Sequence, residues 1–96
     1  MVTAREARQI ALDFLLEEFS ETEANRLVID ESATVERSYG WIFVPTAKRY
    51  LQTGRLDDQF IGAGPLLVLR MSGELIEYSS MYSPQMAAAE YESSAE

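Results

Sequence analysis

The chain has 96 residues and carries 16 acidic against 8 basic side chains, for a formal net charge of -8. Its length fits a single domain, residues 1–96, with a modest core, and its charge repels a phosphate backbone, so nucleic acid is not an expected partner. The sequence has no cysteine and no histidine, which excludes disulfides, thiolate nucleophiles, imidazole bases and the usual zinc ligands.

The N-terminal segment predicts a helix over residues 4–19. Thr3 followed by Glu6 is a capping box, in which each side chain bonds the backbone amide of the other residue. Apolar side chains then sweep an unusually wide arc at helical spacing, formed by Ala7, Ile10, Ala11, Leu12, Phe14, Leu15, Leu16 and Phe19. One sheet face would not cover that arc, so a second element is expected to complete it, either the C-terminal helix or another chain. A homodimer is therefore left open.

The next segment is polar and then strand-like. Residues 20–25 are interpreted as a connector, and residues 27–29 begin a strand. Residues 34–39 alternate between apolar and polar side chains well enough to be extended too. The pattern leaves open whether these are one bent strand or two.

The most hydrophobic run in the central third surrounds Trp41, the only tryptophan. Strand alternation places Trp41 and Phe43 on one face and Ile42 and Val44 on the other. Because both faces are apolar, the run predicts a central strand. Pro45 has no amide hydrogen for the ladder, so it should mark the end of the strand or a bulge.

A short excursion follows. Residues 48–54 predict a helical turn, with Gly54 as a left-handed stop. Residues 55–64 form a loop rich in Gly and Asp, and such loops often carry binding residues. Asp57 and Asp58 are adjacent but lack the spaced oxygen ligands of a calcium loop, so a solvated loop is the expected structure.

The C-terminal third predicts a hairpin and a helix. Strands over residues 65–71 and 74–78 are joined by a two-residue Ser-Gly turn. Ser83 can cap a short helix with Pro84 in its first position. Residues 92–96 are expected to fray.

Together these elements predict an α+β domain, in which the N-terminal helix packs on a mainly antiparallel sheet of about four strands and a short C-terminal helix follows. Gly62-Ala63-Gly64-Pro65 is not a phosphate loop, because it enters a strand rather than a helix. No spacing brings carboxylates or nucleophiles together, and Lys48 is the only lysine. We therefore expect no enzyme activity, no cofactor and no metal site.

Several short patterns stand in order along the chain: Gly-Trp-Ile-Phe from Gly40, Tyr-Leu-Gln-Thr-Gly from Tyr50, Gly-Ala-Gly-Pro from Gly62 and the Ser-Gly turn at Ser72. This ordered set resembles the immunity protein 35 family of bacterial polymorphic toxin systems. Ala63 stands where that family usually has Asn, and Ser72 where it usually has Asp. The resemblance covers residues 27–82, more than half of the chain.

The resemblance implies a small cytoplasmic protein that binds and neutralises a cognate toxin by protein–protein interaction. The sequence agrees with that location, since it has neither a secretory signal nor a run of about 18 apolar residues that would cross a membrane. The family patterns themselves are explained by folding, so a structural role is expected for Trp41, Phe43, Gly54, Gly64 and Pro65.

The acidity is explained by solubility or by steering toward a basic partner. On the second hypothesis, the partner-binding residues are Asp57 and Asp58 in the loop, with Glu74 and Glu77 at the hairpin. A hydrophobic sheet face is the alternative interface. The alternative function is a chaperone-like protein that holds unfolded clients on such a face.

Overall fold

The computed structural model describes residues 1–60 and 62–94. Its helices are α1 (Ala4–Glu18), α2 (Glu21–Ala24), α3 (Lys48–Thr53) and α4 (Pro84–Ser94), with 3-10 turns η1 (Glu31–Ala33) and η2 (Leu56–Asp58). Its strands are β1 (Leu27–Ile29), β2 (Val35–Arg37), β3 (Gly40–Phe43), β4 (Pro45–Ala47), β5 (Leu66–Leu69) and β6 (Leu75–Glu77). The predicted α+β class, with a helix at each end and an antiparallel sheet between them, is confirmed.

The main sheet has four antiparallel strands in the order β2-β3-β5-β6. Trp41 lies in its interior, opposite Val68 of β5 on one side and Glu36 of β2 on the other. The prediction of a central antiparallel strand is therefore confirmed. β1 pairs with β4 in a separate two-stranded sheet, so residues 27–39 form two strands rather than one.

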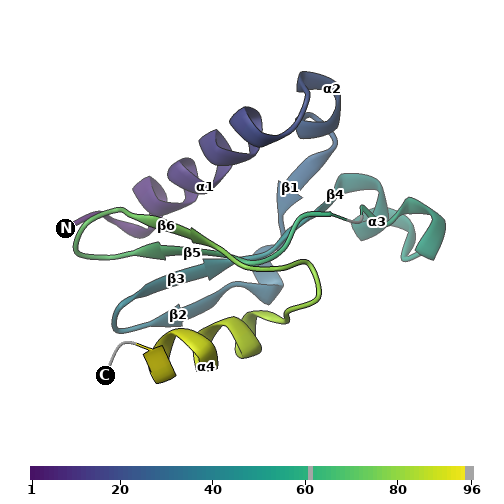
Figure 1. Cartoon of the computed structure of the whole chain (residues 1–96). Coiled ribbons are helices and arrows are strands. Elements are labelled where there is room, and N and C mark those ends of the chain that lie inside the picture. The colour runs from purple at the N-terminus through teal and green to yellow at the C-terminus, as the bar shows by residue number, and fades with distance from the viewer. Residues whose placement is uncertain (61, 95–96) are drawn as a thin grey trace.

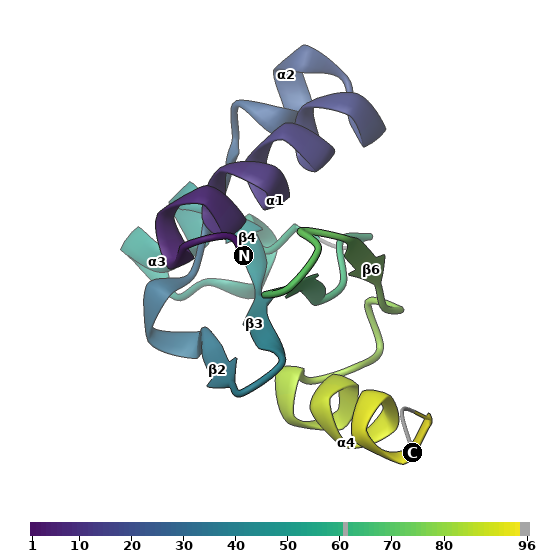
Figure 2. The same ribbon diagram turned by 90° about the vertical axis from the view of Figure 1, so that its left-hand side faces the viewer.

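Both faces of the main sheet are covered by helices, as Figures 1 and 2 show from two directions. α1 buries Ala7, Ala11 and Leu15, one helical turn apart, against the face that carries Trp41 and Phe43. α4 lies on the opposite face. There Ala87 and Ala88 pack on Ile42 and Leu67. The two-sided apolar character of β3 follows from this three-layer arrangement.

The wide apolar arc of α1 is completed from within the chain. α4 does not take part, because it lies beyond the sheet. The arc is covered instead by β1, by Leu75 of β6 and by Phe60, whose ring meets Phe19 edge-on with 5.3 Å between centroids. Only the outer side chain of Leu16 on this arc stays more than half exposed, at 56%.

Pro45 has a second role that the sequence did not reveal. β3 ends at Phe43, as Pro45 predicts, but Pro45 then begins β4 opposite Ile29. The amide of Asp30 donates to the carbonyl of Val44 (2.9 Å), and that of Lys48 to the carbonyl of Arg26 (2.8 Å). Bonded and non-bonded pairs alternate in an antiparallel ladder, so Ile29 and Pro45, next to the bonded Asp30–Val44 pair, form a non-bonded pair. No amide is needed from Pro45 there, which is why the strand tolerates proline.

Three other boundaries differ from the sequence predictions. The expected connector contains the short helix α2, which is capped by a bond from the Glu23 amide to Ser20 Oγ (3.2 Å). The hairpin turn is wider than two residues, because Leu69 pairs with Glu74 around residues 70–73. Helix α4 continues through Ser94 instead of fraying from residue 92; residues 95 and 96 lie outside the described residues.

The predicted helix signals are confirmed. At α1, the Glu6 amide donates to Thr3 Oγ1 (3.2 Å) and the Thr3 amide to Glu6 Oε1 (2.9 Å). Gly54 ends α3 with a φ of 67°. At α4, the Met86 amide donates to Ser83 Oγ (3.1 Å).

Candidate functional site

The four acidic residues predicted to bind a partner lie on two separate surfaces. Asp57 and Asp58 belong to η2, beside α3, whereas Glu74 and Glu77 belong to the β5–β6 hairpin. Figure 1 shows the α3 segment at one end of the molecule and the hairpin turn at the other, close to the N-terminus. The fold therefore brings these residues together in pairs and not as one patch.

Asp57 and Asp58 have different surroundings. The side chain of Asp57 is 88% exposed, and Arg55 approaches it only at 3.8 Å. The side chain of Asp58 is 16% exposed. It accepts hydrogen bonds from Arg49 Nε (3.0 Å) and Thr53 Oγ1 (2.6 Å). Asp58 therefore fixes η2 against α3, while Asp57 faces solvent.

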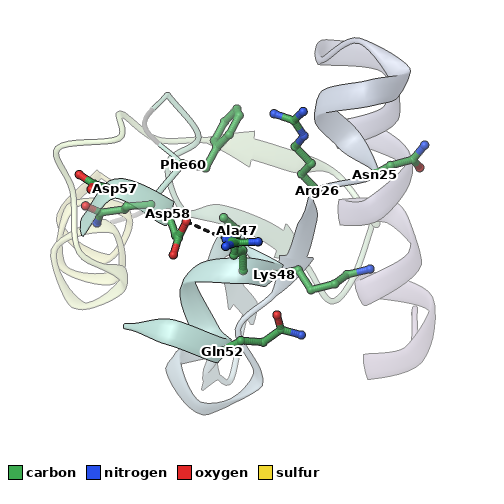
Figure 3. A pocket seen from close by; sticks show the side chains of 10 residues that line it. Asn25, Arg26, Ala47, Lys48, Gln52, Asp57, Asp58 and Phe60 are labelled. Carbon is green, nitrogen blue, oxygen red and sulfur yellow. Dashed lines mark hydrogen bonds and ion pairs between the residues drawn. The ribbon is translucent and has the colours of Figure 1, made fainter. Parts of the chain in front are cut away.

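A polar groove of about 550 Å³ lies between the α3–η2 segment and the start of β1. Arg26 and Lys48 stand on its rim, where the bond between their backbones closes the β1–β4 pair. Neither forms an ion pair with a described residue. Figure 3 shows Asp57 pointing away from the other labelled side chains and Asp58 bonded toward Arg49. Arg26 and Lys48 therefore bring positive charge to this groove. The sequence analysis did not identify Arg26 as a site residue.

A second groove, of about 570 Å³, runs between β6 and α4. We call it the tyrosine groove; its lining is Ile76, Glu77, Tyr78, Ser79, Tyr82, Glu90, Tyr91 and Ser94. The rings of Tyr78 and Tyr82 stack with 5.7 Å between centroids. The Tyr82 hydroxyl donates to Glu90 Oε1 (2.7 Å), and this bond together with the Glu90 charge raises the pKa of Tyr82.

Tyrosines present a flat apolar body and a polar end, which is the chemistry favoured at protein interfaces. The sequence analysis missed this groove, although three of the five tyrosines fall within residues 78–91. Of the two predicted hairpin carboxylates, Glu77 is among the lining residues of the groove, whereas Glu74 lies just before β6 and is not. Both are exposed.

The structural residues predicted from the family patterns occupy constrained positions. Trp41 and Phe43 are 4% and 3% exposed. A Cβ added at Gly64 would lie 2.1 Å from the carbonyl oxygen of Tyr78. The neighbouring Pro65 is buried, and its carbonyl accepts from the Tyr78 amide (3.0 Å).

Within residues 1–60 and 62–94, no group of three acidic, cysteine or histidine side chains is placed to hold a metal ion. No helix in the same part of the chain is long and apolar enough to cross a membrane. Two of the grooves on the described part of the chain thus differ in character: one has Arg26 and Lys48 among its lining residues, and the other is lined by tyrosines and carboxylates.

Comparison with known proteins identifies the family. The family model described as immunity protein 35 matches residues 5–94, a span that includes all of α1 except Ala4, the strands of both sheets and α4. No curated protein and no solved structure matches the chain. Because the match extends over nearly the whole sequence, the chain belongs to the immunity protein 35 family.

Proposed function

We propose that this protein is an immunity protein that binds a cognate bacterial toxin in the cytoplasm of the producing cell and neutralises it by direct contact. The observation that carries the proposal is the family match over residues 5–94. The fold supports it in a second way. A domain with helices packed on both sheet faces is pre-organised, and pre-organised partners usually bind with little movement of the backbone.

Charge suggests how the two proteins meet. The net charge of -8 favours encounter with a basic surface, because complementary fields raise association rates more than they change the strength of the final complex. We propose that Asp57, Glu74 and Glu77, all exposed, contribute to this encounter. Asp58 contributes by holding the loop that presents Asp57.

The chaperone-like alternative has no such support. It requires an exposed apolar sheet face, but the face opposite α1 is covered by α4. Ile42 and Leu67 on that face are 0% exposed. The same burial favours the loops and the sheet edges over the sheet face as the surface that contacts a toxin.

Co-expression tests the proposal. The toxin encoded beside this gene is placed under an inducible promoter, with and without the protein. We expect growth to be restored only when the protein is present, and the tagged toxin to retain it through purification. Growth that stays arrested, although both proteins are produced in soluble form, would contradict the proposal.

A kinetic measurement tests the role of charge. Changing Asp57, Glu74 and Glu77 to their amides should slow association with the purified toxin and reduce its salt dependence. Exposed charges are screened over about 8 Å at physiological ionic strength, so added salt should slow association of the parent in the same way. An association rate that is insensitive to both changes would reject steering while leaving neutralisation intact.

A further inference from the structure

The edge strand β6 presents backbone groups that its sheet does not use. The Leu69 amide donates to the Glu74 carbonyl (2.8 Å) and the Tyr78 amide to the Pro65 carbonyl (3.0 Å). In an antiparallel pair, bonded and non-bonded positions alternate. Ile76 therefore bonds to β5, while the amides and carbonyls of Leu75 and Glu77 point outward from the sheet.

The opposite edge of the sheet, strand β2, presents fewer outward backbone groups. In β2, Val35 and Arg37 face β3 by the same alternation, which leaves Glu36 alone with outward backbone groups. The Glu36 carboxylate is also engaged, since it accepts from Arg70 (3.1 Å). β6 is therefore the edge better suited to receive another strand.

The surroundings of β6 indicate what kind of strand it would receive. Glu74, Glu77 and Glu90 are exposed and form no ion pair within the described part of the chain. Tyr78 and Tyr82 present ring surface in the adjoining tyrosine groove. Carboxylates beside aromatic faces favour a Lys or Arg side chain, through ion pairing and cation–π contact.

A second copy of this chain fits the edge poorly. Pairing two β6 strands would bring Glu74 and Glu77 of each copy close to those of the other, and the copies would each carry a net charge of -8. Like charges opposite one another in a sheet destabilise the pairing. The charge thus favours a basic partner over self-association.

We propose that β6 accepts an extended, basic segment of the toxin as an added strand, with a Lys or Arg side chain in the tyrosine groove. This inference rests on the proposed function and specifies its docking surface. Backbone bonds to Leu75 and Glu77 provide the pairing, and Glu90 selects the charge in the tyrosine groove. By strand alternation the Glu77 side chain lies on the other face of β6, with Leu75, and adds negative charge on that side of the added strand.

The test uses the parent protein and the toxin encoded beside it, carrying a substitution that inactivates the toxin. Amide hydrogen exchange followed residue by residue should show new protection at Leu75 and Glu77 in the complex. Glu77→Pro removes an outward amide without removing a sheet bond and should weaken binding about tenfold or more. Glu77→Gln keeps the amide and should chiefly slow association.

The matched control is Glu36→Pro, which alters the outward position of the other edge and should leave affinity within about twofold of the parent if that edge is not used. Thermal unfolding of each variant establishes that it is folded. Hydrogen exchange in the parent complex does not depend on any variant.

Toxin that binds the parent without protecting Leu75 or Glu77 would overturn the docking surface alone. Toxin that does not bind the parent would overturn the proposed function as well. A toxin-free dimer that protects both amides would replace this inference with self-association.

Discussion

The guanidinium of Arg70 lies over the ring of Trp41, with 4.3 Å between its central carbon and the ring centroid. The same group donates to the carbonyls of Ser38 (3.2 Å) and Arg37 (3.1 Å). Its side chain is 28% exposed. Arg70 follows β5, whereas its partners are Arg37 of β2, Ser38 of the β2–β3 turn and Trp41 of β3. This one side chain therefore joins three strands and covers the ring of Trp41.

Arg70→Ala should lower the free energy of unfolding by about 1–3 kcal/mol. It removes hydrogen bonds from a charged donor and the cation–π contact with Trp41, and partial exposure reduces both contributions. The free energy of unfolding of Arg70→Lys should lie between those of the parent and Arg70→Ala, since a lysine ammonium keeps the charge but lacks the forked donor geometry of a guanidinium. Urea unfolding measures both variants.

Arg49→Ala is the control for that measurement. Arg49 also pairs with a carboxylate, Asp58, but its side chain is 76% exposed. Losing this ion pair in Arg49→Ala should lower the free energy of unfolding by less than about 1 kcal/mol. Equal unfolding midpoints for Arg70→Ala and the parent would show that the contacts of Arg70 do not stabilise the fold.

Gly64→Ala should destabilise the protein more than Gly54→Ala. A Cβ at Gly64 would lie 2.1 Å from the Tyr78 carbonyl oxygen and 2.5 Å from the Ser79 carbonyl carbon, and backbone cannot yield as a side chain can. At Gly54 there is open space, and only the positive φ of 67° opposes alanine, at a cost of about 1–2 kcal/mol. Thermal unfolding of both variants checks the order. A Gly64→Ala protein as stable as Gly54→Ala would contradict the close approach of the chain at Tyr78.

Stability should fall at high pH through Tyr39. Its hydroxyl donates to Glu92 Oε2 (2.7 Å). Burial, then the bond to Glu92, raises the pKa of Tyr39 from 10.0 to about 12. Because the folded state holds this proton more tightly than the unfolded state, the contribution is complete below about pH 10 and is lost as the pH rises through about 12.

Tyr39→Phe tests this dependence. The variant should be less stable than the parent near neutral pH, because it loses the hydrogen bond between Tyr39, in the β2–β3 turn, and Glu92 of α4. Its stability should also decline less steeply than that of the parent between about pH 10 and 12. The free energy of unfolding as a function of pH gives both slopes. Parallel curves for the two proteins would exclude Tyr39 as the titrating group.

The starts of α1 and α4 could be predicted from the sequence because their signals are local. Thr3 and Glu6 cap α1 from three residues apart, and Ser83 caps α4 in the same way. Ser20 and Glu23 show the same spacing at α2, but four helical residues leave too short an apolar pattern to recognise. The two-sided apolar pattern of β3 likewise predicted a central strand, but it did not reveal that α4 covers the second face of the sheet.

The surfaces were harder to predict because they depend on distant contacts. Arg26 and Lys48 lie side by side only because β4 pairs with β1. The sequence around either residue does not indicate that pairing. The tyrosine groove needs the end of β6, the following loop and α4 in one place. Asp58 was predicted to lie in a solvated loop. In the structure its carboxylate accepts hydrogen bonds from Arg49 and Thr53.

The central claim, that this protein neutralises a toxin by binding it, is tested most directly by titration. Increasing amounts of the protein are added to a fixed amount of the purified active toxin encoded beside its gene, and the residual toxin activity is measured. Neutralisation by binding predicts a linear loss of activity that reaches zero at a fixed molar ratio, with full recovery of intact toxin after the complex is denatured and separated. Undiminished activity in the presence of excess folded protein, or inactivation by far less protein than toxin, would contradict the account.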